Sequence, residues 1–332
     1  MTGGLAIATL LFAGGLAPSL PVATSTRIYF SSALDPDDPR PGACAGRDVY
    51  AWEPEGRRPE RLVESGCVLS LFAGDGDEAY AVQRGEGGLS LVRLSGSRAE
   101  ALPELERGRA LGRAALKRRS LNLGISTPPV IAGFVWRLGR IEAVVDAGEG
   151  MAMGVAVSWD GAPSRGVEAV LLGPGLLPAS AVVSSDSGTL YFSRLDKGRG
   201  TIVALPPDRK VTSWGAPEAL PIDWREAAAM AWSIRVPRFL SAAPEGVIVA
   251  DRTPFVFTEA TALSRISEGR DRVMRIPIPD RDVGGIAAVW GGWLVARPLA
   301  GTLTWHGDPG RLPPLWRAAA ITIQETSAEE RE

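Results

Sequence analysis

The chain has 332 residues, of which 45% are hydrophobic and 22% are charged, and its formal net charge is −2. This composition excludes global disorder, and the near balance of charge excludes a general attraction to nucleic acid or anionic lipid. The 39 glycines and 26 prolines favour many tight turns over long helices.

The first predicted element is an apolar run at residues 5–16, followed by Pro18, Pro21 and small side chains. Its length matches the hydrophobic region of a signal peptide and is too short for a transmembrane anchor, although no lysine or arginine precedes it. We therefore expect residues 1–25 to be a signal peptide cleaved near residues 23–26, and the protein to be exported to the periplasm or the cell exterior. The alternative is a buried N-terminal strand or helix, in which case the segment is retained and the protein is cytoplasmic.

Residues 26–325 consist of short predicted strands separated by turn signals, and an acidic tail follows at residues 326–332. The first set of strands spans residues 27–65, and the second has four strands joined by glycine-containing turns between residues 68 and 103. Alternation with a period of two is clear at residues 78–84 and 89–94, so each of these strands presents one face to a core.

The same pattern recurs along the rest of the chain. Four further sets span residues 130–173, 181–214, 238–278 and 285–323. The third strand of the fifth set is predicted at residues 254–260, and the final strand of the sixth set at residues 314–323. Repeated four-stranded units predict an all-β fold, a β-propeller of six blades, with seven also possible. The first set lacks an inner strand once a signal peptide is removed, and we expect residues 319–324 to supply it and close the ring.

One unit carries a family resemblance. Residues 182–207, VVSSDSGTLYFSRLDKGRGTIVALPP, resemble the WD40-like (PD40) repeat of TolB-type propellers. In that repeat a Ser-x-Asp-Gly turn precedes an I-x-F strand, and a charged glycine turn precedes an I-x-V strand. Residues 27–65 are a second copy with a long insertion, and residues 77–94 are a looser third. Ser187 stands where the repeat has glycine. The resemblance implies a propeller with a non-enzymatic binding role.

Two segments interrupt the repeats, at residues 104–125 and 217–236. The first is basic and helix-capable, and the second offers Asp223 as an N-cap with Glu226 three residues later. Both lie between the last strand of one blade and the first strand of the next, so two short helical insertions are expected on one face of the ring. The candidate binding residues on them are Arg113, Arg118, Arg119, Trp224 and Trp232. The alternative is that the basic run is solvated and the tryptophans pack the insertion onto the propeller.

Residues typical of catalysis are scarce. His306 is the sole histidine and no G-x-S-x-G motif occurs, so we expect a structural histidine. Acidic groups at residues 35–38 and 75–78 lack the spacing of a calcium loop and are interpreted as polar turns. Cys44 and Cys67 either form a disulfide, which export would permit, or are unrelated thiols, and with one histidine they do not make a metal site.

The sequence thus favours an exported, monomeric, non-enzymatic propeller that binds or scaffolds a protein, peptide or glycan, with no cofactor and no nucleic-acid partner. The alternative is a propeller enzyme that acts on glycans or a related polymer, with carboxylates near the central channel.

Overall fold

The computed structural model describes a chain made of strands joined by turns. The described residues are 8–12, 16–32, 44, 46–54, 58–85, 88–102, 130–137, 139–146, 151–157, 169–174, 182–184, 188, 190–196, 199–205, 219–220, 236–243, 246–254, 259–267, 273–280 and 283–318. Their strands form six antiparallel sheets of four strands each. Within these ranges no helix has the length and apolar character needed to cross a bilayer.

Five of the sheets are built from strands that follow one another in the chain. The first contains β2 (Pro18–Ala23), β3 (Ile28–Ser32), β4 (Arg47–Trp52) and β5 (Glu60–Val63). The second contains β6 (Val68–Ala73), β7 (Glu78–Gly85), β8 (Gly88–Ser95) and β9 (Arg98–Leu102). The third contains β10 (Val130–Arg137), β11 (Arg140–Asp146), β12 (Met151–Val157) and β13 (Ala169–Pro174).

The remaining three sheets complete the set. The fourth contains β14 (Val182–Ser184), β15 (Leu190–Asp196), β16 (Arg199–Leu205) and β17 (Ala219–Leu220). The fifth contains β18 (Val236–Ala243), β19 (Gly246–Pro254), β20 (Glu259–Ser267) and β21 (Val273–Asp280). The sixth contains β22 (Gly285–Val289), β23 (Gly292–Arg297), β24 (Thr302–His306) and, from the other end of the chain, β1 (Ala8–Phe12).

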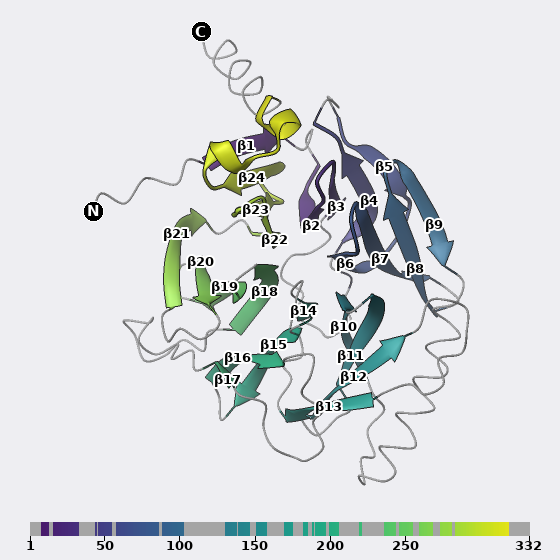
Figure 1. The fold of residues 1–332 in the computed structure, drawn as a ribbon, viewed down its shortest axis with the longest axis vertical. Helices are drawn as coiled ribbons and strands as arrows, with labels where there is room; N and C mark the ends of the chain where they lie inside the picture. Colours follow the sequence, from purple (N-terminus) through teal and green to yellow (C-terminus); the bar gives the residue numbers. More distant parts are fainter. Residues whose placement is uncertain are drawn as a thin grey trace.

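The six sheets are arranged radially in a ring (Figure 1). The first strand of each set, β2, β6, β10, β14, β18 and β22, lies nearest the centre, and each of these inner strands contacts the next all the way round. Such a ring is a β-propeller, in which each twisted sheet packs its faces against its two neighbours. The sequence prediction of an all-β propeller is confirmed.

The sixth sheet illustrates how alternation builds a blade. Leu294 and Leu303 are fully buried in a cluster with Ile28 of the first sheet. Thr302 and Thr304 alternate with Leu303, so they occupy the opposite face of the sheet, and both are also buried. Both faces of this sheet are therefore covered, as the propeller architecture requires.

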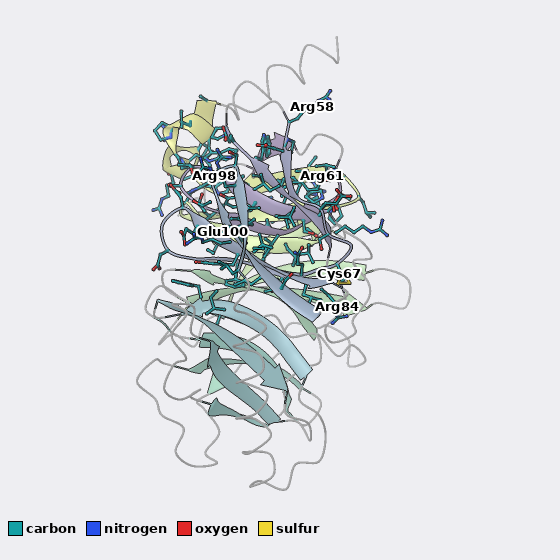
Figure 2. The ribbon with its side chains drawn as sticks, turned by 90° about the vertical axis from the view of Figure 1, so that its right-hand side faces the viewer. Arg58, Arg61, Cys67, Arg84, Arg98 and Glu100 are labelled. Carbon is teal, nitrogen blue, oxygen red and sulfur yellow. A yellow bond between two sulfur atoms is a disulfide. The ribbon has the colours of Figure 1, made fainter. Side chains whose placement is uncertain are left out.

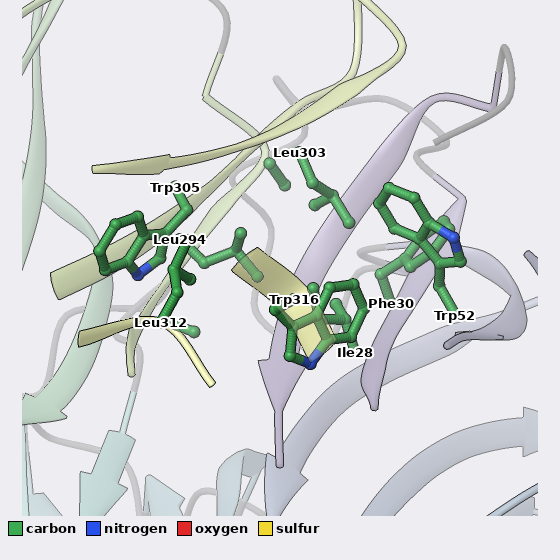
Figure 3. Close-up of a cluster of buried hydrophobic side chains, with 10 residues drawn as sticks. Ile28, Phe30, Trp52, Leu294, Leu303, Trp305, Leu312 and Trp316 are labelled. Carbon is green, nitrogen blue, oxygen red and sulfur yellow. The ribbon is translucent and has the colours of Figure 1, made fainter. Parts of the chain in front are cut away.

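The junction between the sixth and first sheets has an aromatic core (Figure 3). Trp316 is fully buried and meets the ring of Trp52 edge-on at 5.7 Å and the ring of Trp290 at 5.5 Å. Around them lie further buried side chains from both sheets and from the segment after β24: Ile28, Phe30, Ala287, Leu294, Ala296, Leu303, Trp305 and Leu312. This core fastens the C-terminal part of the described chain to the first sheet.

Ring closure differs from the sequence prediction. The inner strand of the first sheet is β2, so the prediction that residues 319–324 fill this position is wrong. Residues 309–311 form a short 3-10 helix (η1, Pro309–Arg311), and residues 314–318 are helical where the start of a final strand was expected. Residues 319–324 themselves lie outside the described residues.

Two other strands are shifted from their predicted positions. The third strand of the fifth sheet is β20 at Glu259–Ser267 rather than residues 254–260. The fourth strand of the fourth sheet is β17 at Ala219–Leu220, whereas the predicted strand at residues 210–214 lies outside the described residues.

Candidate functional site

The strand order gives the ring two distinct faces. Because the four strands of each sheet alternate in direction, every link from one sheet to the next emerges on the same face. We call this the insertion-bearing face: β9 ends on it at Leu102 and β10 begins on it at Val130. The opposite face, which we call the turn face, carries the tight turns at residues 24–27, 74–77, 96–97 and 290–291.

The five predicted binding residues cannot be placed side by side from the structure. Arg113, Arg118 and Arg119 fall between β9 and β10, and Trp224 and Trp232 fall between β17 and β18, outside the described residues. What the structure gives is the position of the strand ends that flank them. Leu220 and Val236, like Leu102 and Val130, are at the insertion-bearing face.

A disulfide lies at the insertion-bearing face. The sulfur atoms of Cys44 and Cys67 are 1.96 Å apart, and the bond links the connection between β3 and β4 to the start of the inner strand β6. Gly46 and Val68 pair beside it through two backbone hydrogen bonds of 3.1 and 2.7 Å. The first and second sheets are thus joined covalently at this edge.

Arg84 lies next to the disulfide. Its backbone N–H donates to the carbonyl of Cys67 at 2.9 Å, and the residue is exposed at the end of β7. Figure 2 shows Cys67 and Arg84 together on one side of the ring, and Arg98, from the β8–β9 turn, on the other. The described part of the insertion-bearing face therefore carries a disulfide-linked edge with Arg84 exposed beside it.

The turn face carries the acidic turn at residues 75–78, whose carboxylates are engaged by neighbouring sheets. Asp75 accepts a hydrogen bond of 2.8 Å from the indole N–H of Trp136 in the third sheet. Asp77 accepts a hydrogen bond of 2.6 Å from the hydroxyl of Ser25 in the first sheet, and this bond lowers the pKa of the Asp77 carboxyl. The turn links three consecutive sheets, and across the described part of the chain no cluster of three or more potential metal ligands occurs.

An aromatic stack continues this link between the second and third sheets. The ring of Tyr80 lies between those of Phe72 and Trp136, with centroid distances of 5.5 and 5.4 Å and nearly parallel planes. The Tyr80 hydroxyl donates to Glu78 at 2.9 Å, and burial raises the pKa of Tyr80. Offset stacks of this kind add about 1 kcal/mol each beyond the area that they bury, so the stack is a structural joint.

His306, the sole histidine, ends β24. Its ring stacks on that of Trp293 at 6.3 Å with an interplanar angle of 9°. The two residues face each other across the β23–β24 pair, so the histidine is held within its sheet. This is the structural position that the sequence led us to expect.

The comparisons with known proteins identify the architecture. No protein-family model and no curated protein sequence matches the chain. Among solved structures, the Myceliophteria thermophila Cps50 (Swd1) β-propeller domain is 10% identical with a TM-score of 0.54, and the match covers 91% of this chain and 100% of that one. The WD40 repeats of RRP9 are 12% identical with a TM-score of 0.50, and the match covers 90% and 97%.

The fold is a β-propeller. A luciferin-regenerating enzyme also matches, at 10% identity and a TM-score of 0.51, over 92% of this propeller and 96% of that enzyme. The sequence resemblance to WD40-like repeats is therefore confirmed for the fold. At these identities the likeness is one of architecture, and propellers carry both enzymes and binding proteins.

The turn-face contacts of this propeller were not predicted from sequence. Residues 75–78 were correctly interpreted as a polar turn, but nothing local indicated that Trp136, more than fifty positions later, would bind Asp75. The only available signal was the residue type at position 136. A tryptophan at the end of a strand carries an indole N–H that needs an acceptor when its ring is packed.

Proposed function

We propose that this propeller is a binding or scaffold module that recognises a protein, peptide or glycan through its insertion-bearing face. The observation that carries the proposal is topological. The strand ends that flank both non-repeating segments, at Leu102 and Val130 and at Leu220 and Val236, lie on one face of the ring. Connecting segments held on a rigid scaffold are where propellers and other β-folds place binding residues.

The segment that joins the insertion-bearing face between β9 and β10 has more basic than acidic residues even with Glu104 and Glu106 counted, which favours a partner with anionic groups. The segment between β9 and β10 includes Arg113, Arg118 and Arg119, and Arg84 is exposed on the same face. Trp224 and Trp232 belong to the other segment and supply aromatic surface suited to an apolar side chain or a sugar ring. Cationic and aromatic side chains on such segments suit an acidic protein, an acidic peptide or an anionic glycan.

We prefer a binding function to glycan hydrolysis because the carboxylates of the β6–β7 turn are already hydrogen-bonded to neighbouring sheets. Asp75 and Asp77 accept hydrogen bonds from Trp136 and Ser25 and join adjacent sheets. A glycosidase pair must face its substrate across roughly 5–10 Å. These two carboxylates instead serve the turn.

We further propose that the protein works in an oxidising compartment outside the cytoplasm, the periplasm or the cell exterior. The Cys44–Cys67 disulfide supports this location, because disulfides persist in exported proteins and are rare where thiols are kept reduced.

The proposal is tested by affinity capture from native cell-envelope extract, with the full chain as bait. We compare the wild type with R118E/R119E, which reverses two charges in the segment between β9 and β10. The matched control is R98E/R311E, which reverses two exposed charges at the turn face. We expect at least a tenfold loss of the captured partner with R118E/R119E and no change with R98E/R311E.

Two other outcomes and one further variant are informative. Equal capture by all three proteins would refute the choice of face. Equal loss in both variants would indicate attraction to net charge rather than to a surface. A variant W224A/W232A, assayed in the same way, measures the aromatic contribution independently of charge.

A further inference from the structure

The segment that reads as a signal peptide contributes strands to two sheets. β1 pairs with β24 over five residue pairs, from Ala8 opposite His306 to Phe12 opposite Thr302, and is the outermost strand of the sixth sheet. β2 then crosses to the first sheet and pairs with β3 as its inner strand. The same short stretch therefore belongs to the two sheets at which the ring closes.

β2 is bound to both of its neighbours by polar contacts. The backbone N–H of Leu20 donates to the carbonyl of Gly284, just before β22 in the sixth sheet, at 3.2 Å. The hydroxyl of Ser19, which is 2% exposed, donates to the carbonyl of Ser31 on β3 at 3.2 Å. Removing β2 would leave both acceptors without these donors.

The sixth sheet is also shaped to receive β2. A Cβ placed on Gly285 would lie 2.6 Å from Cδ of Pro21 and 2.9 Å from the backbone nitrogen of Leu20. Only glycine permits so close an approach at this point of β22. The two inner strands therefore fit together at the level of the backbone.

β2 also fills the core between the first and second sheets. Val22 is 8% exposed and belongs to a buried cluster with Tyr29 and Val49 of the first sheet and Val68 and Val92 of the second. A chain that began at residues 24–27 would lack Val22 and would leave this cluster with a cavity.

From these contacts we propose that residues 8–23 are a two-strand strap that closes the ring and remains on the mature chain. Cleavage near residues 23–26 would remove β1 and β2 together and open the ring between its sixth and first sheets. The apolar run is then a strand in the working protein, as in the retained-segment alternative that the sequence left open. The Cys44–Cys67 disulfide still supports an oxidising compartment rather than the cytoplasm, so the chain would reach that compartment without cleavage near residues 23–26. The strap is independent of the binding face proposed above, and failure of one proposal leaves the other standing.

The first test is the intact mass of the full chain, expressed in a host that can export it and purified from the compartment where it accumulates. We expect a mass that includes residues 8–23 and a tryptic peptide that contains Val22. A mature chain beginning at residues 24–27, folded and monodisperse, would overturn the proposal.

The second test uses V22A and the matched control L299A, because Leu299 is 84% exposed. Removing two buried methyl groups lowers the ratio of folded to unfolded protein by about tenfold, measured by urea unfolding, whereas L299A changes it less than about twofold. If residues 1–23 were removed during maturation, purified V22A would equal the wild type in mass and in unfolding midpoint. That equality would refute the strap.

Discussion

The disulfide at the insertion-bearing face makes a quantitative prediction. The double substitution C44A/C67A removes the link between the first and second sheets. Alanine is chosen because Cys67 is only 7% exposed, and a serine hydroxyl there would add the cost of burying a polar group.

The magnitude follows from the size of the closed loop. The two cysteines are 23 residues apart, and closing a loop of this length in the unfolded chain costs about 3 kcal/mol in the chain-entropy model. The variant should therefore be less stable by about 3 kcal/mol, which lowers the ratio of folded to unfolded molecules on the order of 100-fold.

Urea unfolding followed by tryptophan fluorescence measures this difference. The wild type in reductant should unfold at the same urea concentration as the variant, and reductant should leave the variant unchanged. If oxidised wild type, reduced wild type and variant all share one midpoint, the disulfide does not constrain the unfolded chain and the reasoning is wrong.

Three further predictions concern the packing and the turn face. Replacing the fully buried Trp316 with alanine should lower the free energy of unfolding by about 3–5 kcal/mol, as measured by urea titration. Trp136→Phe keeps an aromatic ring but removes the N–H that donates to Asp75. It should lower the free energy of unfolding by about 1 kcal/mol in the same assay. Because the Ser25 hydroxyl lowers the pKa of Asp77, its stabilising effect is present above the ordinary carboxyl pKa and is lost as pH falls through the lowered value. In Ser25→Ala, an NMR titration should show the pKa of Asp77 rising.

The first two of these have a matched comparison. Leu315→Ala, at a side chain 54% exposed beside Trp316, should change stability by less than about 0.5 kcal/mol. Asp75→Ala removes the acceptor and should reproduce the loss seen with Trp136→Phe, and the double variant should lose no more than the larger single loss. Additive losses would show that the two groups do not act on each other.

Much of the fold was predictable because propeller strands are local in sequence. Five of the six sheets are formed by four consecutive strands, so turn signals and period-two alternation located most of their strands, although β2 was assigned to the signal peptide and β17 and β20 were misplaced. Ring closure was not local. β1 meets β24 from the far end of the chain, and an apolar run near the N-terminus has the same composition as a leader.

The segment after β24 shows a second limit. Residues 314–323 are apolar enough for a strand, but two prolines, Pro313 and Pro314, stand at the start. Proline suits the first turn of a helix, and the N–H of Arg317 donates to the carbonyl of Pro313 at 2.9 Å. The helix then brings Trp316 into the junction core, a contact that only the tertiary structure reveals. The five predicted binding residues lie outside the described residues and remain predictions: Arg113, Arg118, Arg119, Trp224 and Trp232.

The pairing of β1 with β24 also implies a delay between the synthesis of the two strands. Leu10 lies opposite Thr304, and these positions are 294 residues apart. At ribosomal rates of about 5–20 residues per second, β1 leaves the ribosome about 15–60 s before its partner strand exists. For that interval the apolar first strand has no native partner, so we expect it to stay unpaired until β24 emerges.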